Sequence, residues 1–168
     1  MKKLHFIFIF FLISFCSHSQ QLTNVVVDKN LNLFLPDNYE VMDTLGTKNY
    51  NSKIDNGYVV LVIIQDDRDE IKNAKELRVF YKKFQKGMLK QANGDLISDS
   101  LIEIDKTKVN KTTFVTTIPN MIQWNAYTIR IESTTYSLQF IYPERINKNE
   151  TETQIIESLK FYTETKLN

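Results

Sequence analysis

Five consecutive charged side chains form the densest group of chemically active residues in this sequence, at Asp66-Asp67-Arg68-Asp69-Glu70. Clustered carboxylates can bind Ca²⁺, or act in pairs as a general acid and a general base. The spacing is not that of a calcium loop, however, and no glycine supplies the sharp turn that such a loop needs. We therefore interpret the cluster as a solvated loop, with Ca²⁺ binding and carboxylate catalysis as less favoured alternatives.

Basic side chains recur along one side of a segment with helical periodicity, over residues 73–91. At ~100° per residue they span an arc of about 140° opposite the apolar side chains, and Glu76 at the edge is the only acid in the stretch. Solvated helix faces usually mix charges, because Glu-Lys pairs support each other. Two interpretations remain: a solvated face, or a docking surface for an anionic envelope surface or an acidic protein. The residues are Lys75, Arg78, Lys82, Lys83, Lys86 and Lys90.

The single tryptophan, Trp124, marks a third candidate site. An aromatic side chain on a strand usually belongs to the core. If the predicted sheet has an open face, Trp124 with Tyr127 and Tyr136 would line a small apolar pocket. Both interpretations stay open at the level of sequence.

Histidine and cysteine occur only within the first 19 residues, as His5, Cys16 and His18. Once that segment is removed, the chain lacks the residues that a disulfide, a thiol nucleophile, a Ser-His pair or a typical zinc site requires. The sequence also contains no Gly-rich phosphate loop and no nucleic-acid-binding motif. We therefore predict no catalytic residues, no metal, no cofactor and no nucleic-acid partner.

Removal of the first segment is itself predicted from its composition. Two lysines precede an apolar run over residues 4–15, and small residues follow, which is the order of a secretory signal. The run is shorter than the ~20 apolar residues of a membrane span. We place cleavage between Ser19 and Gln20, and predict an exported protein, periplasmic or extracellular, without a transmembrane helix. Lipidation of Cys16 is a less favoured alternative, because the bulky Phe15 stands where lipoprotein signals have a small residue.

The remaining chain of roughly 150 residues is long enough for one domain with a proper core. Without Lys2 and Lys3 it carries one fewer basic residue than its 20 acidic ones, a net charge of −1, so it is no polycation. We predict a signal peptide over residues 1–19, an N-terminal extension over 20–29 and a single domain over 30–168.

Strand patterns precede and follow the predicted helix. The run over residues 58–65 is continuous and β-branched, which predicts a central strand covered on both faces. Alternating apolar residues on both sides of a tight turn near residue 133 predict an antiparallel hairpin. The predicted strands cover residues 31–35, 48–54, 58–65, 96–104, 109–118, 122–132 and 135–142.

Two amphipathic helices complete the prediction. In the first, over residues 73–91, large apolar side chains recur at three- and four-residue steps, and Asn93-Gly94 ends it. The second, over residues 150–163, has Glu150 and Glu152 in its first turn, where the helix dipole favours acids. Because short turns force neighbouring strands to be antiparallel, the order predicts an α+β fold. It would have one mostly antiparallel β-sheet of about six or seven strands with two packed helices.

This order of elements resembles the PsbP-like superfamily, which includes PsbP, the Mog-type Ran-binding proteins and small bacterial envelope proteins. The resemblance covers residues ~30 to ~162. It rests on the strand at 58–65, the helix after it, and three short segments: Phe34-Leu35-Pro36-Asp37-Asn38-Tyr39, Tyr136-Ser137-Leu138-Gln139-Phe140 and Ile156-Glu157-Ser158-Leu159-Lys160-Phe161. It implies the superfamily's fold and a binding or assembly role, and it carries no catalytic set.

These observations predict an exported, non-enzymatic binding or assembly module of the bacterial envelope, with an unknown partner. One alternative is a carrier of a small apolar ligand held between sheet and helix. The other, less favoured, is a carboxylate-based hydrolase that uses residues 66–70.

Overall fold

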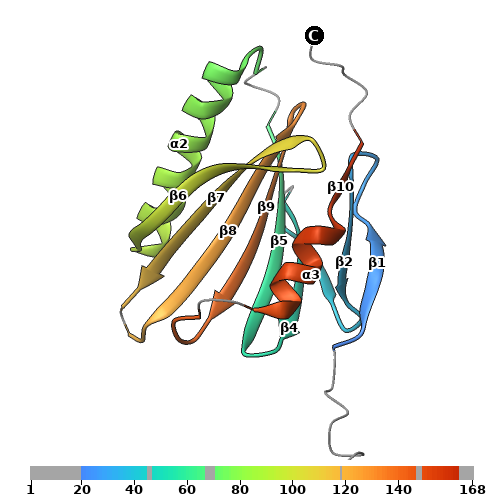
Figure 1. Ribbon diagram of the computed structural model, residues 1–168, viewed down its shortest axis with the longest axis vertical. Coiled ribbons are helices and arrows are strands. Elements are labelled where there is room, and N and C mark those ends of the chain that lie inside the picture. Colours follow the sequence, from blue (N-terminus) through green and yellow to red (C-terminus); the bar gives the residue numbers. More distant parts are fainter. Residues whose placement is uncertain (1–19, 45–46, 67–70, 118, 147–148, 163–168) are drawn as a thin grey trace, which may run out of the picture.

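The computed structural model describes residues 20–44, 47–66, 71–117, 119–146 and 149–162, which form ten strands and two helices (Figure 1). Every strand pair among these residues is antiparallel, which confirms the predicted α+β class. All seven predicted strands are present, with ends that differ by a few residues. In chain order the elements are β1 (Leu22–Val26), β2 (Leu31–Pro36), β3 (Glu40–Thr44), β4 (Thr47–Ile54), β5 (Gly57–Gln65), α2 (Ala74–Ala92), β6 (Asp95–Ile104), β7 (Thr107–Thr116), β8 (Ile122–Ile131), β9 (Thr134–Tyr142), α3 (Glu150–Ser158) and β10 (Lys160–Phe161).

Two sheets replace the single sheet that the sequence predicts. The large sheet has seven strands in the order β3-β4-β5-β9-β8-β7-β6, and the small one has the order β1-β2-β10. The difference comes from short strands with weak patterns. β1 lies within the segment interpreted as an N-terminal extension, and neither β3 nor β10 is predicted. Since β1 pairs with β2 from Leu22 to Val26, the folded part begins before residue 30.

The hairpin of β8 and β9 is confirmed, and β5 lies between β4 and β9 inside the large sheet. The two faces of β5 differ, however, where the sequence predicts that both are covered. Its buried side chains are Val59, Leu61 and Ile63. The alternate residues, which include Val62 and Ile64, are only half-buried. The continuous apolar run therefore reflects one covered face and one partly open face.

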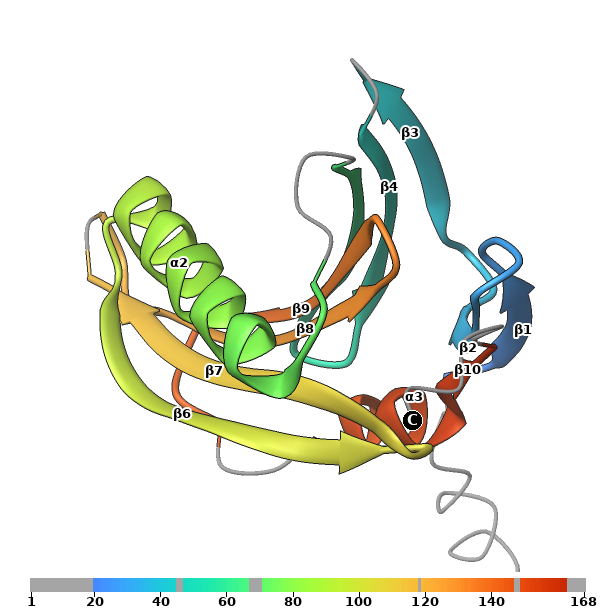
Figure 2. The same ribbon diagram turned by 90° about the horizontal axis from the view of Figure 1, so that it is seen from above.

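The helices lie on opposite faces of the large sheet (Figure 2). The main hydrophobic core lies on the side of α3 and the small sheet, where Leu31, Leu61 and Leu138 are fully buried. On the other face α2 packs over β7 and β8, so that Ala126 and Thr128 on β8 are buried there. α2 leaves part of its face of the sheet open, where Val62 and Ile64 on β5 are only half-buried.

α2 corresponds closely to the predicted helix over residues 73–91. Its N-cap is Asn73, whose side-chain oxygen accepts hydrogen bonds from two backbone N–H groups of the first turn, both at 3.0 Å. At the other end Asn93 adopts a left-handed conformation with φ 50°. Gly94 follows, and a Cβ there would come within 2.5 Å of the Phe114 ring, so only glycine fits without a shift of that ring.

α3 is shorter than the helix predicted over residues 150–163. It ends at Ser158, and the chain continues into β10, whose two residues pair with β2. Leu159 is buried, whereas Tyr162, which the predicted helix includes, is 52% exposed. Strand pairing with β2 thus replaces the last helical turns; Thr163 lies outside the described residues.

Candidate functional site

All six basic side chains predicted to share a helix face are exposed on α2. We call this set, Lys75, Arg78, Lys82, Lys83, Lys86 and Lys90, the basic face of α2. Among the described residues, no ion pair involves any of them. Glu76, the acid nearest to them in sequence, is occupied at the helix start, where it accepts hydrogen bonds from the backbone N–H of Lys72 and the side chain of Asn73. The helix therefore presents a cationic face without paired acids, and the exposed Val79 lies in the same arc.

The opposite side of α2 is fastened to the sheet by two buried side chains, Tyr81 and Gln85. The Tyr81 hydroxyl donates to the carbonyl of Lys108 at 2.8 Å and accepts from the N–H of Arg130 at 3.3 Å. Burial raises the pKa of Tyr81 to about 12, so the hydroxyl stays protonated at neutral pH. The side-chain amide of Gln85 donates to the Thr112 hydroxyl at 3.4 Å. These contacts orient the basic face away from the sheet.

Of the acidic cluster at residues 66–70, only Asp66 lies within the described residues. Its N–H donates to the carbonyl of Ser133 at 2.9 Å, and its carbonyl accepts from the Arg130 guanidinium at 2.9 Å. These bonds tie the end of β5 to the turn between β8 and β9. Within the described part of the chain, no group of three or more His, Cys, Asp or Glu converges as a metal site would require.

Trp124, Tyr127 and Tyr136 do not meet in one pocket. Successive side chains of a strand point to opposite faces, so Trp124 and Tyr127, three positions apart on β8, lie on different sides of the sheet. Trp124 stacks on Phe114 with 5.5 Å between ring centroids. On the other face, the Tyr136 hydroxyl donates to the Asp28 carboxylate at 2.7 Å. Burial, with a smaller contribution from Asp28, raises the pKa of Tyr136 above its usual range.

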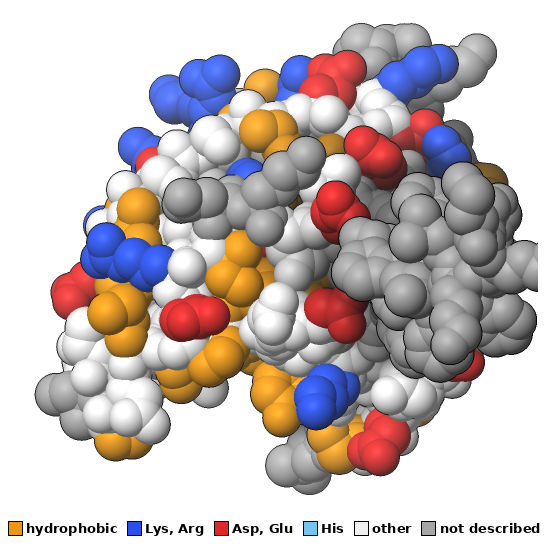
Figure 3. Space-filling view, turned by 60° about the horizontal axis from the view of Figure 1, so that its bottom comes forward, with side chains coloured by type: hydrophobic (Ala, Val, Ile, Leu, Met, Phe, Trp, Pro, Cys, Tyr) orange, Lys and Arg blue, Asp and Glu red, His pale blue; other side chains and the backbone are white. Residues whose placement is uncertain are grey.

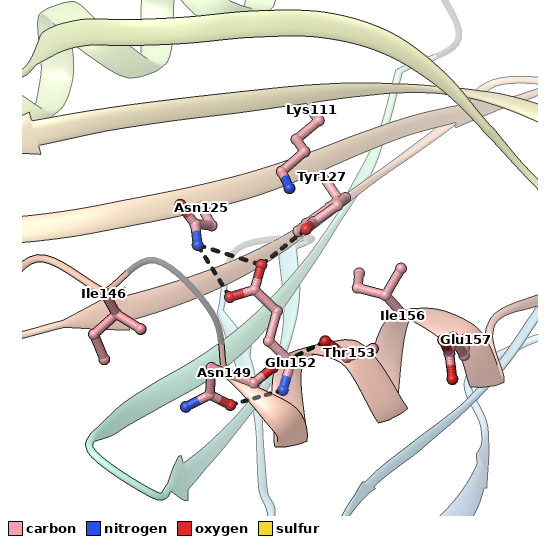
Figure 4. Close-up of a pocket in the computed structure, with 9 residues that line it drawn as sticks. All are labelled: Lys111, Asn125, Tyr127, Ile146, Asn149, Glu152, Thr153, Ile156 and Glu157. Atoms are coloured by element: carbon pink, nitrogen blue, oxygen red, sulfur yellow. Dashed lines mark hydrogen bonds between the residues drawn. The ribbon is translucent and has the colours of Figure 1, made fainter.

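A buried carboxylate that the sequence does not single out lies where α3 meets the sheet (Figure 4). Glu152 accepts hydrogen bonds from the hydroxyls of Tyr127 at 2.8 Å and Tyr142 at 2.6 Å, and from the Asn125 amide at 3.0 Å. Its own N–H donates to the helix-capping Asn149 at 2.9 Å. Burial raises the pKa of both tyrosines well above the usual range, and the neighbouring carboxylate adds to the shift. Both hydroxyls therefore remain donors at neutral pH.

This network borders a cavity of about 280 Å³ between α3, β7 and β8. Lys111 enters it from β7, with its Nζ 5.2 Å from the centroid of the Tyr127 ring. Both carboxylate oxygens of Glu152 already accept hydrogen bonds, so the network accounts for the position of α3 without a ligand. In sequence, Glu152 is an ordinary first-turn acid three residues after a helix cap, and nothing in that spacing indicates its burial.

A second hollow, of about 1020 Å³, opens at the end of the large sheet where β5 and β8 begin and β9 ends. Its walls include Tyr58 and Met121, which are 56% and 46% exposed, and the half-buried Ile141. Hydrophobic side chains are visible on this end of the molecule between charged ones (Figure 3). Lys53 and Arg145 stand at its rim. The sequence does not predict this hollow, because three separate turns and strand ends contribute to it.

Neither helix of the described residues combines the length and the hydrophobicity that crossing a bilayer requires.

No protein-family model and no curated protein matches this sequence. Solved structures do match. The solution structure of cyanobacterial PsbP (CyanoP) from Synechocystis is 12% identical with a TM-score of 0.64, over 85% of this chain and 94% of that one. The Saccharomyces cerevisiae Ran-binding protein Mog1p is 7% identical with a TM-score of 0.52, over 84% of this chain and 96% of that one.

A crystal structure from Bacteroides thetaiotaomicron is 11% identical with a TM-score of 0.55 over 86% of this chain, and this chain spans 50% of its length. Identities this low establish the fold alone. The chain therefore has the fold shared by PsbP and Mog1p, as the order of its elements predicts.

Proposed function

We propose that this chain is an exported, non-enzymatic binding module that docks on an anionic surface of the cell envelope through the basic face of α2. The observation that carries the proposal is the exposure of six cations on one helix face, none of which forms an ion pair within the described residues. The fold, shared with a Ran-binding protein, supports a role in binding. The leader-like sequence at the start of the chain supports export.

The energetics of such docking are favourable. Each Lys or Arg near an anionic membrane surface contributes about 1 kcal/mol, and the attraction falls off within a Debye length. Six such side chains on one rigid helix can therefore hold the domain at a surface at low ionic strength. Tyr81 and Gln85 fasten the opposite side of α2, so docking requires no rearrangement of the helix. Strong salt dependence is the expected signature.

Co-sedimentation with lipid vesicles tests this contact. The domain is expected to bind vesicles rich in phosphatidylglycerol, and not vesicles of phosphatidylcholine alone. The double variant Lys82→Glu, Lys86→Glu should weaken this binding about tenfold or more, because each reversal removes an attraction and adds a repulsion.

The matched control is Lys29→Glu with Lys106→Glu, two exposed lysines outside α2 with the same change in net charge. Of these two lysines, only Lys29 has an ion pair within the described residues, an exposed one with Glu132 that contributes little to stability. Equal loss in both double variants would show that overall charge, not the basic face, governs binding.

Export is tested separately, by the intact mass of the protein isolated from its own cells. A chain that begins at or near Gln20 is expected. A diacylated chain that begins at Cys16 would indicate lipid anchoring, and an uncleaved chain in the cytoplasm would contradict export.

A further inference from the structure

Apolar side chains are exposed to solvent around the hollow at the end of the large sheet. Tyr58 and Met121 keep about half of their surface in contact with solvent, and no segment of the described chain covers them. Tyr58 pairs with Ile141 across β5 and β9, so these walls are held by the rigid sheet. Grouped exposed apolar side chains around a concave surface are typical of a ligand site.

The charged side chains at the rim of this hollow indicate which charge a ligand would carry. Lys53 approaches from the end of β4, and Arg145 follows β9, next to Glu144. Neither cationic side chain has an ion pair or a side-chain hydrogen bond within the described residues. Two cations and one carboxylate, that of Glu144, leave the rim with a net positive charge. The planar guanidinium of arginine can bind the carboxylate of a ligand through two parallel hydrogen bonds.

We propose that this hollow binds a small amphipathic carboxylate, a molecule with an apolar body and one carboxylate end. The body lies against Tyr58, Met121 and Ile141, and the carboxylate is held by Arg145 and Lys53. The site differs in place from the one in the carrier hypothesis, which puts the ligand between sheet and helix. It shares no residue with the basic face of α2, so it does not depend on the proposed docking function.

Decanoate is a suitable probe, because it combines a flexible apolar chain with a carboxylate. Trp124, the only tryptophan, pairs with Ile141 on the neighbouring strand and reports on the hollow through its fluorescence. We expect saturable 1:1 binding with a Kd below about 1 mM, confirmed by titration calorimetry. Binding of 1-decanol and of decylamine should be at least about tenfold weaker, because neither offers a carboxylate to the rim cations.

Variants separate the two parts of the site. Arg145→Ala should weaken decanoate binding about tenfold and leave 1-decanol binding unchanged. Met121→Glu should abolish decanoate binding, because it places a like charge among the walls. Met42→Glu is the matched control on β3, where the side chain is 50% exposed and lies outside the hollow.

Three results would overturn the proposal: no saturation by decanoate, decylamine binding as tight as decanoate binding, or equal effects of the two methionine variants. The double variant Lys82→Glu, Lys86→Glu should leave decanoate binding unchanged. This variant therefore distinguishes a failure of the proposed ligand site from a failure of the proposed docking surface.

Discussion

The two helices of the described chain are attached to the large sheet in opposite ways. α3 has nine residues and buries Thr151, Glu152 and Ile155, with the Glu152 carboxylate inside a network of hydroxyl and amide donors. α2 is twice as long, with 19 residues, and buries only Tyr81 and Gln85. One helix is held by its acidic first turn against the core, and the other rests on the sheet with its cations outward.

This difference separates stability from the proposed function. A buried carboxylate with several donors cannot be removed without leaving those donors unpaired, so α3 contributes to the stability of the fold. The outer face of α2 makes no ion pair within the described residues, so its side chains can be selected for binding instead. Substitutions on α3 should therefore act on folding, and substitutions on the basic face should act on binding alone.

The largest effect is expected from Glu152→Ala. The substitution leaves the hydroxyls of Tyr127 and Tyr142 and the Asn125 amide without their acceptor, and should lower the free energy of unfolding by about 3 kcal/mol. Glu152→Gln keeps one acceptor oxygen and should cost about half as much. Urea denaturation measures both. A loss below about 0.5 kcal/mol for Glu152→Ala would show that α3 is not held by this network.

Alkaline pH should weaken the attachment of both α2 and α3 to the large sheet, because buried tyrosine hydroxyls hold both helices. The pKa of Tyr81 is raised to about 12 by burial, and burial also raises the pKa of Tyr127 and Tyr142. The folded state therefore favours the protonated hydroxyls. Stability is fully present below pH ~10, the pKa of an unfolded tyrosine, and falls above it by up to ~1.4 kcal/mol per pH unit for each tyrosine.

Urea denaturation from about pH 8 to about pH 11.5 measures this slope. Tyr81→Phe should reduce the slope through α2, and Tyr142→Phe should reduce it through α3. A free energy of unfolding that stays constant up to about pH 11.5 would contradict the burial of these hydroxyls.

The smallest effect on stability is expected from Lys82→Glu with Lys86→Glu. Both side chains are exposed on α2, so their reversal should change the free energy of unfolding by less than about 0.5 kcal/mol each. The same denaturation series, with far-ultraviolet circular dichroism for helix content, provides the measurement. A loss of more than about 2 kcal/mol would mean that the basic face has a structural role after all.

The periodicity of the sequence is sufficient to predict the long elements, because α2 and the β8–β9 hairpin each show their pattern over many residues. It missed β1, β3 and β10, which are short: β1 and β3 pair with the strands that follow them, and β10 pairs with β2 near the other end of the chain. The separation of Trp124 from Tyr127 follows from strand alternation and was available in the sequence. The burial of Glu152 was not, because it depends on donors from β8 and β9 that only the tertiary structure brings together.

A lysine footprint shows whether the basic face of α2 is the docking surface. A chain that begins at Gln20 is acetylated briefly with and without phosphatidylglycerol vesicles, and the modification of each lysine is quantified by mass spectrometry. We expect protection of Lys82, Lys83 and Lys86, with Lys29 and Lys106 as reactive as before. Equal protection of all lysines, or protection confined to residues outside α2, would contradict it.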